Sequence, residues 1–215
     1  MSASSSASPK QLHGVPDNLL YVFVISRHGQ RTPIARCQNL PKKEPVDYGQ
    51  LTAKGREQTF KLGQYLRDRY DAFLRGSDSP GHSMWEDLLW ADQTVFAQIL
   101  VGYERPFAAY ILGHVLDALA EKFEERVKGP DRMHVFSMSD TSLFSVLKLL
   151  NESHDVRPCF CASILIEVYK DGNVNRVRVL YRAEDEPCLV PTNKVENPCE
   201  LSEFLEFLRG ILNTP

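Results

Sequence analysis

The sequence lacks an excess of either charge and has no long run of apolar residues. Its 25 Lys and Arg residues nearly balance its 28 Asp and Glu residues, leaving a net charge of −3, so its charge does not point to a nucleic acid or an anionic membrane as partner. The apolar stretch at residues 19–25 is too short to span a bilayer. Residues 1–10 are rich in Ser and Ala and resemble neither a signal peptide nor a membrane span, so we expect the chain as written to be cytoplasmic.

Cysteine and histidine are scarce and are not arranged as metal ligands. The chain has 5 Cys and 6 His residues, without a zinc-type Cys spacing or a His pair of metal-ligand spacing. Its 215 residues, 43% of them hydrophobic and 25% charged, have the composition of a soluble globular protein with one sizeable domain. We expect residues 1–15 to form a disordered tail and residues 16–215 to form the single domain, and we leave the oligomeric state open.

An apolar run at residues 19–25 ends abruptly in a polar, cationic cluster. The run predicts a strand buried on both faces, most simply in a parallel sheet, and α/β folds bind ligands at the carboxyl ends of such strands. Arg27, His28 and Arg31 would repel one another without an anion, and phosphate is the natural guest of paired guanidinium groups. We predict that His28 attacks phosphorus while Arg27 and Arg31 hold its oxygens. The alternative is a surface loop with scattered basic residues.

A second apolar run, residues 133–138, ends in Ser139 and Asp140 and repeats this arrangement. The ends of two such strands can face each other across a crevice. Asp140 is therefore our candidate for the acid that protonates the leaving alcohol. From the residues alone, capping of a helix that begins near Ser142 explains Asp140 equally well.

Other elements follow from periodicity and turn residues. Thr52 is the predicted N-cap of a helix that ends at Gly76. Residues 163–170 and 175–182 flank the pair Asp171-Gly172, which predicts a β-hairpin. Apolar stripes predict further helices within residues 85–99, 107–123, 143–150 and 201–208.

Residues 27–33, Arg-His-Gly-Gln-Arg-Thr-Pro, resemble the signature RHGxRxP of the histidine acid phosphatases. Residues 48–58 are similar to the LTxxGxxQ stretch that follows in that family, and the resemblance resumes near residue 106 and continues to about residue 208. It implies a mostly parallel central sheet flanked by helices, with a reduced helical cap. It also implies hydrolysis of small phosphomonoesters through a phosphohistidine, without a metal or an organic cofactor.

The same resemblance assigns roles to individual residues. It makes His28 the nucleophile, Arg27 and Arg31 the phosphate clamps and Asp140 the proton donor. It further implies a disulfide between the cysteines at the two ends of a Pro-containing loop, Cys188 and Cys199. Because the family is mostly secreted or lysosomal, it implies one of those locations and conflicts with the cytoplasmic expectation above.

The sequence departs from the family pattern in two places. Ser139 replaces the His of the family's His-Asp pair, and although its hydroxyl can bind a phosphate oxygen, it carries no charge. A long family segment, which includes a strand ending in Arg-Ser-Thr and much of the cap, is missing, so residues 77–105 are a remnant of the cap region. We therefore expect impaired phosphatase activity. The alternatives are a catalytically inactive binding or interaction protein and an unstable fragment.

Overall fold

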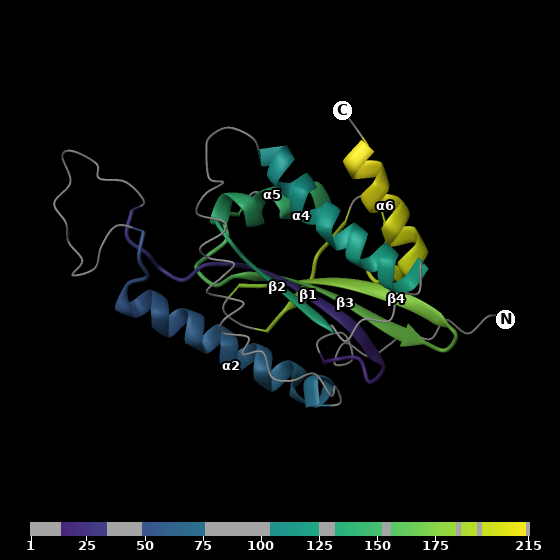
Figure 1. Cartoon of the computed structure of the whole chain (residues 1–215), viewed down its shortest axis with the longest axis horizontal. Coiled ribbons are helices and arrows are strands. Elements are labelled where there is room, and N and C mark those ends of the chain that lie inside the picture. Colours follow the sequence, from purple (N-terminus) through teal and green to yellow (C-terminus); the bar gives the residue numbers. More distant parts are fainter. Residues whose placement is uncertain are drawn as a thin grey trace.

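The computed structural model describes residues 14–33, 49–75, 104–124, 132–151, 156–183, 186–192 and 195–213. Within these residues a central β-sheet lies between helices on its two faces (Figure 1). The elements, in chain order, are β1 (Leu19–Arg27), α2 (Ala53–Arg75), α4 (Glu104–Leu119), the π-helical turn η1 (Ala120–Glu124), β2 (Met133–Met138), α5 (Asp140–Leu150), β3 (Ser163–Asp171), β4 (Val174–Arg182), β5 (Cys188–Leu189), β6 (Cys199–Glu200) and α6 (Leu201–Asn213). The predicted α/β class and the sheet flanked by helices are confirmed.

The directions of the strands correct the prediction of a mostly parallel sheet. The strand order is β2-β1-β3-β4-β5, and β6 also pairs with β4. Within the described chain, β1 and β2 are parallel and the other pairings are antiparallel. Burial of β1 on both faces suggested parallel neighbours. That burial comes instead from helices on both sides of the sheet, and such helices cover parallel and antiparallel strands alike.

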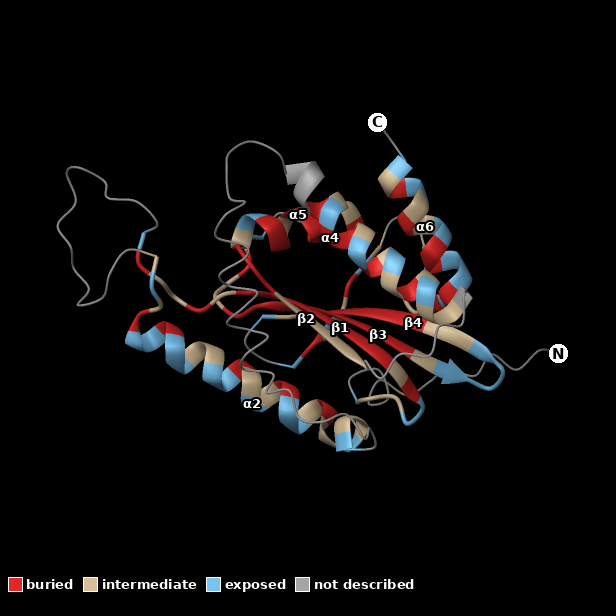
Figure 2. Cartoon of the chain, in the orientation of Figure 1, coloured by how far each residue is buried: buried red, intermediate tan, exposed pale blue. Residues whose placement is uncertain are grey.

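The side chains of β1 alternate between two hydrophobic cores. Tyr21, Phe23 and Ile25 pack among residues of α4, α5 and α6, whereas Val22 and Val24 pack against α2. This alternation follows from the two-residue period of a strand. Figure 2 shows the buried sides of the helices turned toward the sheet. Burial on both faces fixes the position of β1, whose carboxyl end carries the cationic cluster.

Helix α2 begins and packs as its sequence predicts. The Thr52 hydroxyl accepts a hydrogen bond from the Gly55 amide at 3.0 Å, which confirms the predicted N-cap. Leu62, Leu66 and Tyr70 form the buried face. The predicted hairpin is also confirmed, because a turn at Gly172, whose φ is +58°, joins β3 to β4.

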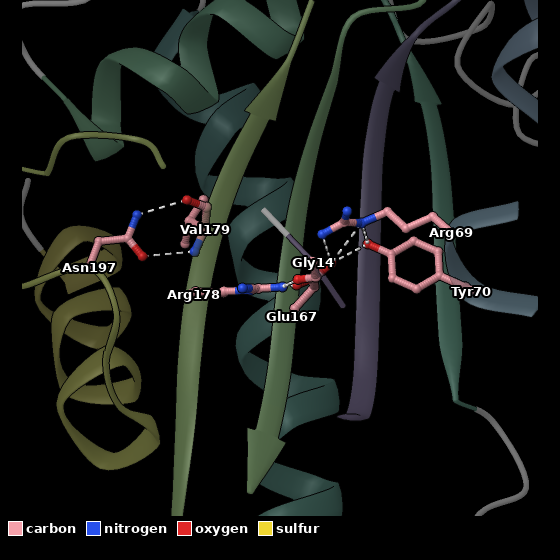
Figure 3. A network of polar contacts seen from close by, with 7 residues as sticks. All are labelled: Gly14, Arg69, Tyr70, Glu167, Arg178, Val179 and Asn197. Atoms are coloured by element: carbon pink, nitrogen blue, oxygen red, sulfur yellow. Dashed lines mark hydrogen bonds and ion pairs between the residues drawn. The ribbon is translucent and has the colours of Figure 1, made fainter. Parts of the chain in front are cut away.

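A buried ionic network ties α2 to the sheet (Figure 3). Glu167 of β3 is fully buried, and its carboxylate binds Arg69 of α2 at 2.8 Å and Arg178 of β4 at 2.6 Å. The Tyr70 hydroxyl donates a hydrogen bond to the same carboxylate at 2.6 Å. Burial opposes the charge of Arg69, but the attraction of Glu167 outweighs this effect and raises the pKa of Arg69. The network therefore fixes α2 against the middle of the sheet.

Contacts near the N-terminus shorten the predicted tail. The Gly14 carbonyl accepts a hydrogen bond from Arg178, and Val15 packs on the core beneath α2. Gly14 and Val15 therefore belong to the folded part, and the rest of the predicted tail lies outside the described residues. The helix predicted within residues 85–99 also lies outside them, as does most of the predicted cap remnant. The single domain from residue 16 stays a prediction.

The disulfide implied by the family resemblance is absent. Cys188 of β5 lies opposite Tyr181 of β4, and Cys199 of β6 lies opposite Val177. These partners are four residues apart on β4, or roughly 13 Å at the rise of a strand. A disulfide requires Cα atoms within about 7 Å, so the two thiols are free.

Candidate active site

The parallel pairing of β1 with β2 brings their carboxyl ends to the same edge of the sheet. The His28 amide donates a hydrogen bond to the Met138 carbonyl at 2.9 Å, directly before Ser139. The Arg27 amide donates to the Ala162 carbonyl at 2.8 Å, directly before β3. Arg27, His28, Ser139 and Asp140 therefore gather at this edge, as the repeated pattern of strand and polar turn predicted.

The hydrogen bonds of His28 define the state of its ring. Nδ1 lies 2.7 Å from the Gly29 carbonyl, and because a carbonyl only accepts, the ring hydrogen is on Nδ1. Nε2 accepts a hydrogen bond from the Nε of Arg31 at 3.0 Å. These contacts are those of a neutral imidazole, whose lone pair on Nε2 accepts the hydrogen bond of Arg31. This is the nitrogen that can act as a nucleophile.

The loop after His28 is held by a close approach to the start of α2. A Cβ at Gly29 would lie 2.2 Å from the Gly55 carbonyl oxygen, and a Cβ at Gly55 would lie 1.8 Å from that of Gln30. Both distances are far below any real contact, so glycine is required at both positions. The Gln30 carbonyl accepts a hydrogen bond from the Thr52 amide at 3.0 Å. The backbone amide of Gln30 donates a hydrogen bond to the Gln58 side chain at 2.9 Å. Gly29 therefore allows the loop after β1 to pack directly against the backbone of the first turn of α2.

Arg27 lies deeper than Arg31 and is bound mainly by protein groups. Its Nη1 donates to the Pro158 carbonyl at 2.7 Å, and its guanidinium carbon lies 3.9 Å from the centre of the Phe160 ring. Its Nη2 lies 3.5 Å from the Asp140 carboxylate. Burial lowers the pKa of Arg27, and the charge of Asp140 opposes this effect. Its buried Nε has no hydrogen-bond partner within the described part of the chain.

Ser139 is the N-cap of α5, which corrects the alternative that gave this role to Asp140. Its hydroxyl oxygen accepts from the Ser142 amide at 3.1 Å and lies 2.9 Å from the Ser142 hydroxyl. Asp140 is the first residue of the helix. The serine that replaces the family histidine is thus already engaged with its own helix.

Asp140 is held by two arginines. Its Oδ2 accepts from the Nε of Arg157 at 2.6 Å and also contacts Nη2 of that residue, in addition to the contact with Arg27. Burial would raise the pKa of Asp140, but the hydrogen bond of Arg157 and the charges of both arginines together lower it below its ordinary value. The free protein therefore holds this carboxylate ionised.

Arg157 is the site residue that sequence reasoning missed. It precedes a proline after a polar stretch, which is typical of a solvated surface residue, and only the fold brings it to Asp140. Two other basic residues near β2 lie elsewhere. His134 packs its ring against Tyr21 and Phe23, and Arg132, before β2, donates to the Phe73 carbonyl.

The described residues offer no metal site and no membrane span. No group of three or more His, Cys, Asp or Glu side chains is placed to hold a metal ion in the part of the chain that the structure describes. None of the helices in this part combines the length and the apolar character needed to cross a bilayer.

No protein-family model matches the chain, but curated proteins match part of it. Prostatic acid phosphatase of Bos taurus is 47% identical over 62 residues, which are 27% of this chain and 16% of that enzyme. Testicular acid phosphatase of Homo sapiens is 44% identical over 62 residues, 26% of this chain and 15% of that protein. Lysosomal acid phosphatase of Rattus norvegicus is 41% identical over 63 residues, 28% of this chain and 15% of that protein. The aligned part thus spans about a sixth of the length of these relatives.

Solved structures of phytases share the fold over most of the chain. The phytase from D. castellii superposes with a TM-score of 0.60 at 12% identity, covering 93% of this chain and 81% of that one. The Hafnia alvei phytase in complex with tartrate has a TM-score of 0.60 at 10% identity, covering 94% of this chain and 100% of that one. About a quarter of the chain is thus similar in sequence to acid phosphatases, and the described part shares its fold with the phytases.

Proposed function

We propose that the chain hydrolyses small phosphate monoesters through a phosphohistidine at His28. The observation that carries this proposal is the neutral ring of His28, which holds its hydrogen on Nδ1 and presents Nε2 beside Arg31. The partial likeness to acid phosphatases and the phytase fold support the same reaction class.

Two steps complete the proposed reaction. First, Nε2 of His28 forms a bond to phosphorus as the bond to the leaving oxygen breaks, and protonated Asp140 gives its proton to that oxygen. Next, a water attacks phosphorus, the N–P bond breaks, and the Asp140 carboxylate takes the proton of the water. Arg31 binds the non-bridging oxygens, and Arg27, whose Nη1 and Nη2 face Pro158 and Asp140, acts with it at the inner side of the site.

The proposed activity is weak compared with a complete relative. Ser139 supplies no charge, and its oxygen caps α5. Loss of a charged contact to the reacting phosphate costs about 2–4 kcal/mol, or roughly two to three orders of magnitude in rate. Because the pKa of Asp140 is lowered in the free protein, we expect turnover to need acidic pH.

A phosphate-ester binding protein without turnover is the second candidate. It is favoured by the ion pair of Asp140 with Arg157, which opposes protonation of the proposed acid. Steady hydrolysis of para-nitrophenyl phosphate at acidic pH would support the enzyme, whereas phosphate binding without hydrolysis would support the binding protein.

Covalent labelling tests the nucleophile directly. Incubation with a radiolabelled activated phosphoester and an alkaline quench should give a label that is stable to alkali and lost in acid. We expect this label on the wild type and on His114→Ala, whose exposed histidine lies on α4, but not on His28→Ala. Equal labelling of His28→Ala and wild type would contradict the proposal.

A further inference from the structure

Besides Arg27 and Arg31, Arg157 brings a guanidinium to the edge of the sheet that carries His28. Arg157 lies in the segment before β3, and its Nε is 2.6 Å from the Oδ2 of Asp140. That carboxylate oxygen is also 3.5 Å from Arg27, so Arg157 and Arg27 share one carboxylate. Its hydrogen bonds within the described residues go to Asp140 alone.

The backbone near Arg157 is fixed while its guanidinium is open to solvent. The next residue, Pro158, accepts the hydrogen bond of Arg27 at 2.7 Å, and Phe160 stacks on the same guanidinium at 3.9 Å. The side chain of Arg157 is nevertheless 77% exposed. Arg157 thus joins a fixed backbone to a guanidinium that binds Asp140 and is still accessible to solvent.

The chemistry needed at this place is a cation next to Ser139. Ser139 is buried, carries no charge and uses its oxygen as the cap of α5. Arg157 contacts Asp140, the residue after Ser139, so the charge of Arg157 lies close to the uncharged Ser139. A guanidinium has five N–H donors in a planar fork, which allows it to hold a carboxylate and a phosphate together.

We propose that Arg157 is a phosphate-binding residue of this site, which shares its guanidinium between Asp140 and the substrate and supplies the charged contact that Ser139 does not. This inference rests on the proposed function, because it deepens the same site. When phosphate accepts hydrogen bonds from the Arg157 guanidinium, the hydrogen bond between Arg157 and Asp140 weakens. This change favours protonation of the Asp140 carboxylate. Among the described residues, the charged groups that face Asp140 are Arg27 from β1 and Arg157, and the Thr141 amide faces it from its own helix.

The test compares Arg157→Gln and Arg157→Lys with a control variant, Arg75→Gln. Arg75 is matched to Arg157, because it is 78% exposed and pairs with a carboxylate, Asp71, but it lies at the far end of α2. Affinity for inorganic phosphate is measured by calorimetry and by the rise in melting temperature. Hydrolysis of para-nitrophenyl phosphate is measured as kcat and KM across pH, and melting without phosphate confirms that each variant is folded.

We expect Arg157→Gln to weaken phosphate binding and to raise KM by roughly 10- to 100-fold, as for a hydrogen bond between charged groups. Arg157→Lys, which keeps the charge but loses the fork, should lie between Gln and wild type, and Arg75→Gln should match wild type. The fall of kcat/KM with rising pH should move to higher pH in Arg157→Gln, because its Asp140 loses the partner that lowers its pKa.

The outcomes separate this inference from the proposed function. Hydrolysis with unchanged KM and phosphate affinity in Arg157→Gln would overturn the role of Arg157 and leave the hydrolysis standing. If Arg157→Gln weakens phosphate binding but the wild type shows no turnover, the phosphate-binding role of Arg157 is upheld and the proposed hydrolysis is rejected. A wild type that does not bind phosphate would overturn the role of Arg157, whatever its turnover.

Discussion

The Nε of Arg31 lies 3.0 Å from the Nε2 of His28 and donates a hydrogen bond to it. The proposed nucleophile is therefore occupied by a guanidinium in the free protein. A phosphate dianion is a stronger acceptor than a neutral imidazole and would draw this donor to itself. The lone pair of Nε2 would then become available as phosphorus arrives.

Arg31 should control the binding of oxyanions. Vanadate or phosphate should raise the melting temperature of the wild type by mass action, and Arg31→Ala should lose most of this rise because its clamp is gone. Thermal denaturation with and without the anion measures the effect. Arg75→Ala serves as the control, and an undiminished rise in Arg31→Ala would show that the clamp is assigned wrongly.

Replacement of Ser139 should separate its capping role from its place in the site. Ser139→Ala and Ser139→His both remove the cap of α5 and should lower the free energy of unfolding by about 1 kcal/mol. Only Ser139→His adds an imidazole, and it should raise turnover at acidic pH, where imidazole is charged. Urea denaturation and a pH–rate profile test the two effects.

The gain from Ser139→His should depend on Arg157. If Arg157 supplies the charged contact, the added imidazole should raise the rate more in the Arg157→Gln background than in the wild type. Adding Asp140→Asn should abolish the gain in either background, because the acid is still needed. A gain that survives Asp140→Asn would exclude Asp140 as the proton donor.

The stability contributed by Asp140 should depend on pH in a defined direction. Its folded-state pKa is lowered, so its contribution is present above the pKa of the unfolded chain and is lost as the pH falls through the folded-state pKa. Asp140→Asn should therefore be less stable than wild type at neutral pH and equal to it in strong acid. Urea denaturation at a series of pH values gives this difference, and a constant difference would contradict the assignment.

The buried network of Figure 3 should matter for stability. Glu167→Gln leaves the nearly buried Arg69 and Arg178 without their counter-charge and should lower the free energy of unfolding by about 3–5 kcal/mol. Glu57→Gln removes an exposed i,i+4 pair with Lys61 and should have no measurable effect. Equal decreases in the free energy of unfolding of the two variants would show that the buried network stabilises the fold no more than an exposed ion pair does.

Local signals were enough to predict much of the fold. The apolar run before Arg27, the similar run before Ser139 and the turn at Gly172 each predicted an element correctly, because burial periodicity and backbone conformation are encoded in neighbouring residues. Strand direction was predicted wrongly, because burial on both faces does not distinguish a parallel from an antiparallel neighbour.

The site was predictable only where it follows directly from strand ends. His28 and Asp140 each follow an apolar run, and the parallel pairing of those strands brings them to one edge. Arg157 comes to Asp140 from 17 residues further along the chain. No local pattern marks it, because an arginine before a proline is common on solvated surfaces. The disulfide implied for Cys188 and Cys199 was wrong for a similar reason. The distance between these cysteines is set by where β5 and β6 pair along β4, which their neighbours in the sequence do not show.

The contact of Gly29 with Gly55 also has a consequence for how such proteins can vary. Because neither glycine leaves room for a methyl group, the loop that carries the nucleophile and the first turn of α2 behave as one rigid part. Glu167 fastens the same helix further along, so this part is anchored to the sheet independently of whatever follows Arg75. Insertions or deletions after α2 can then change the length of the chain there without shifting the imidazole.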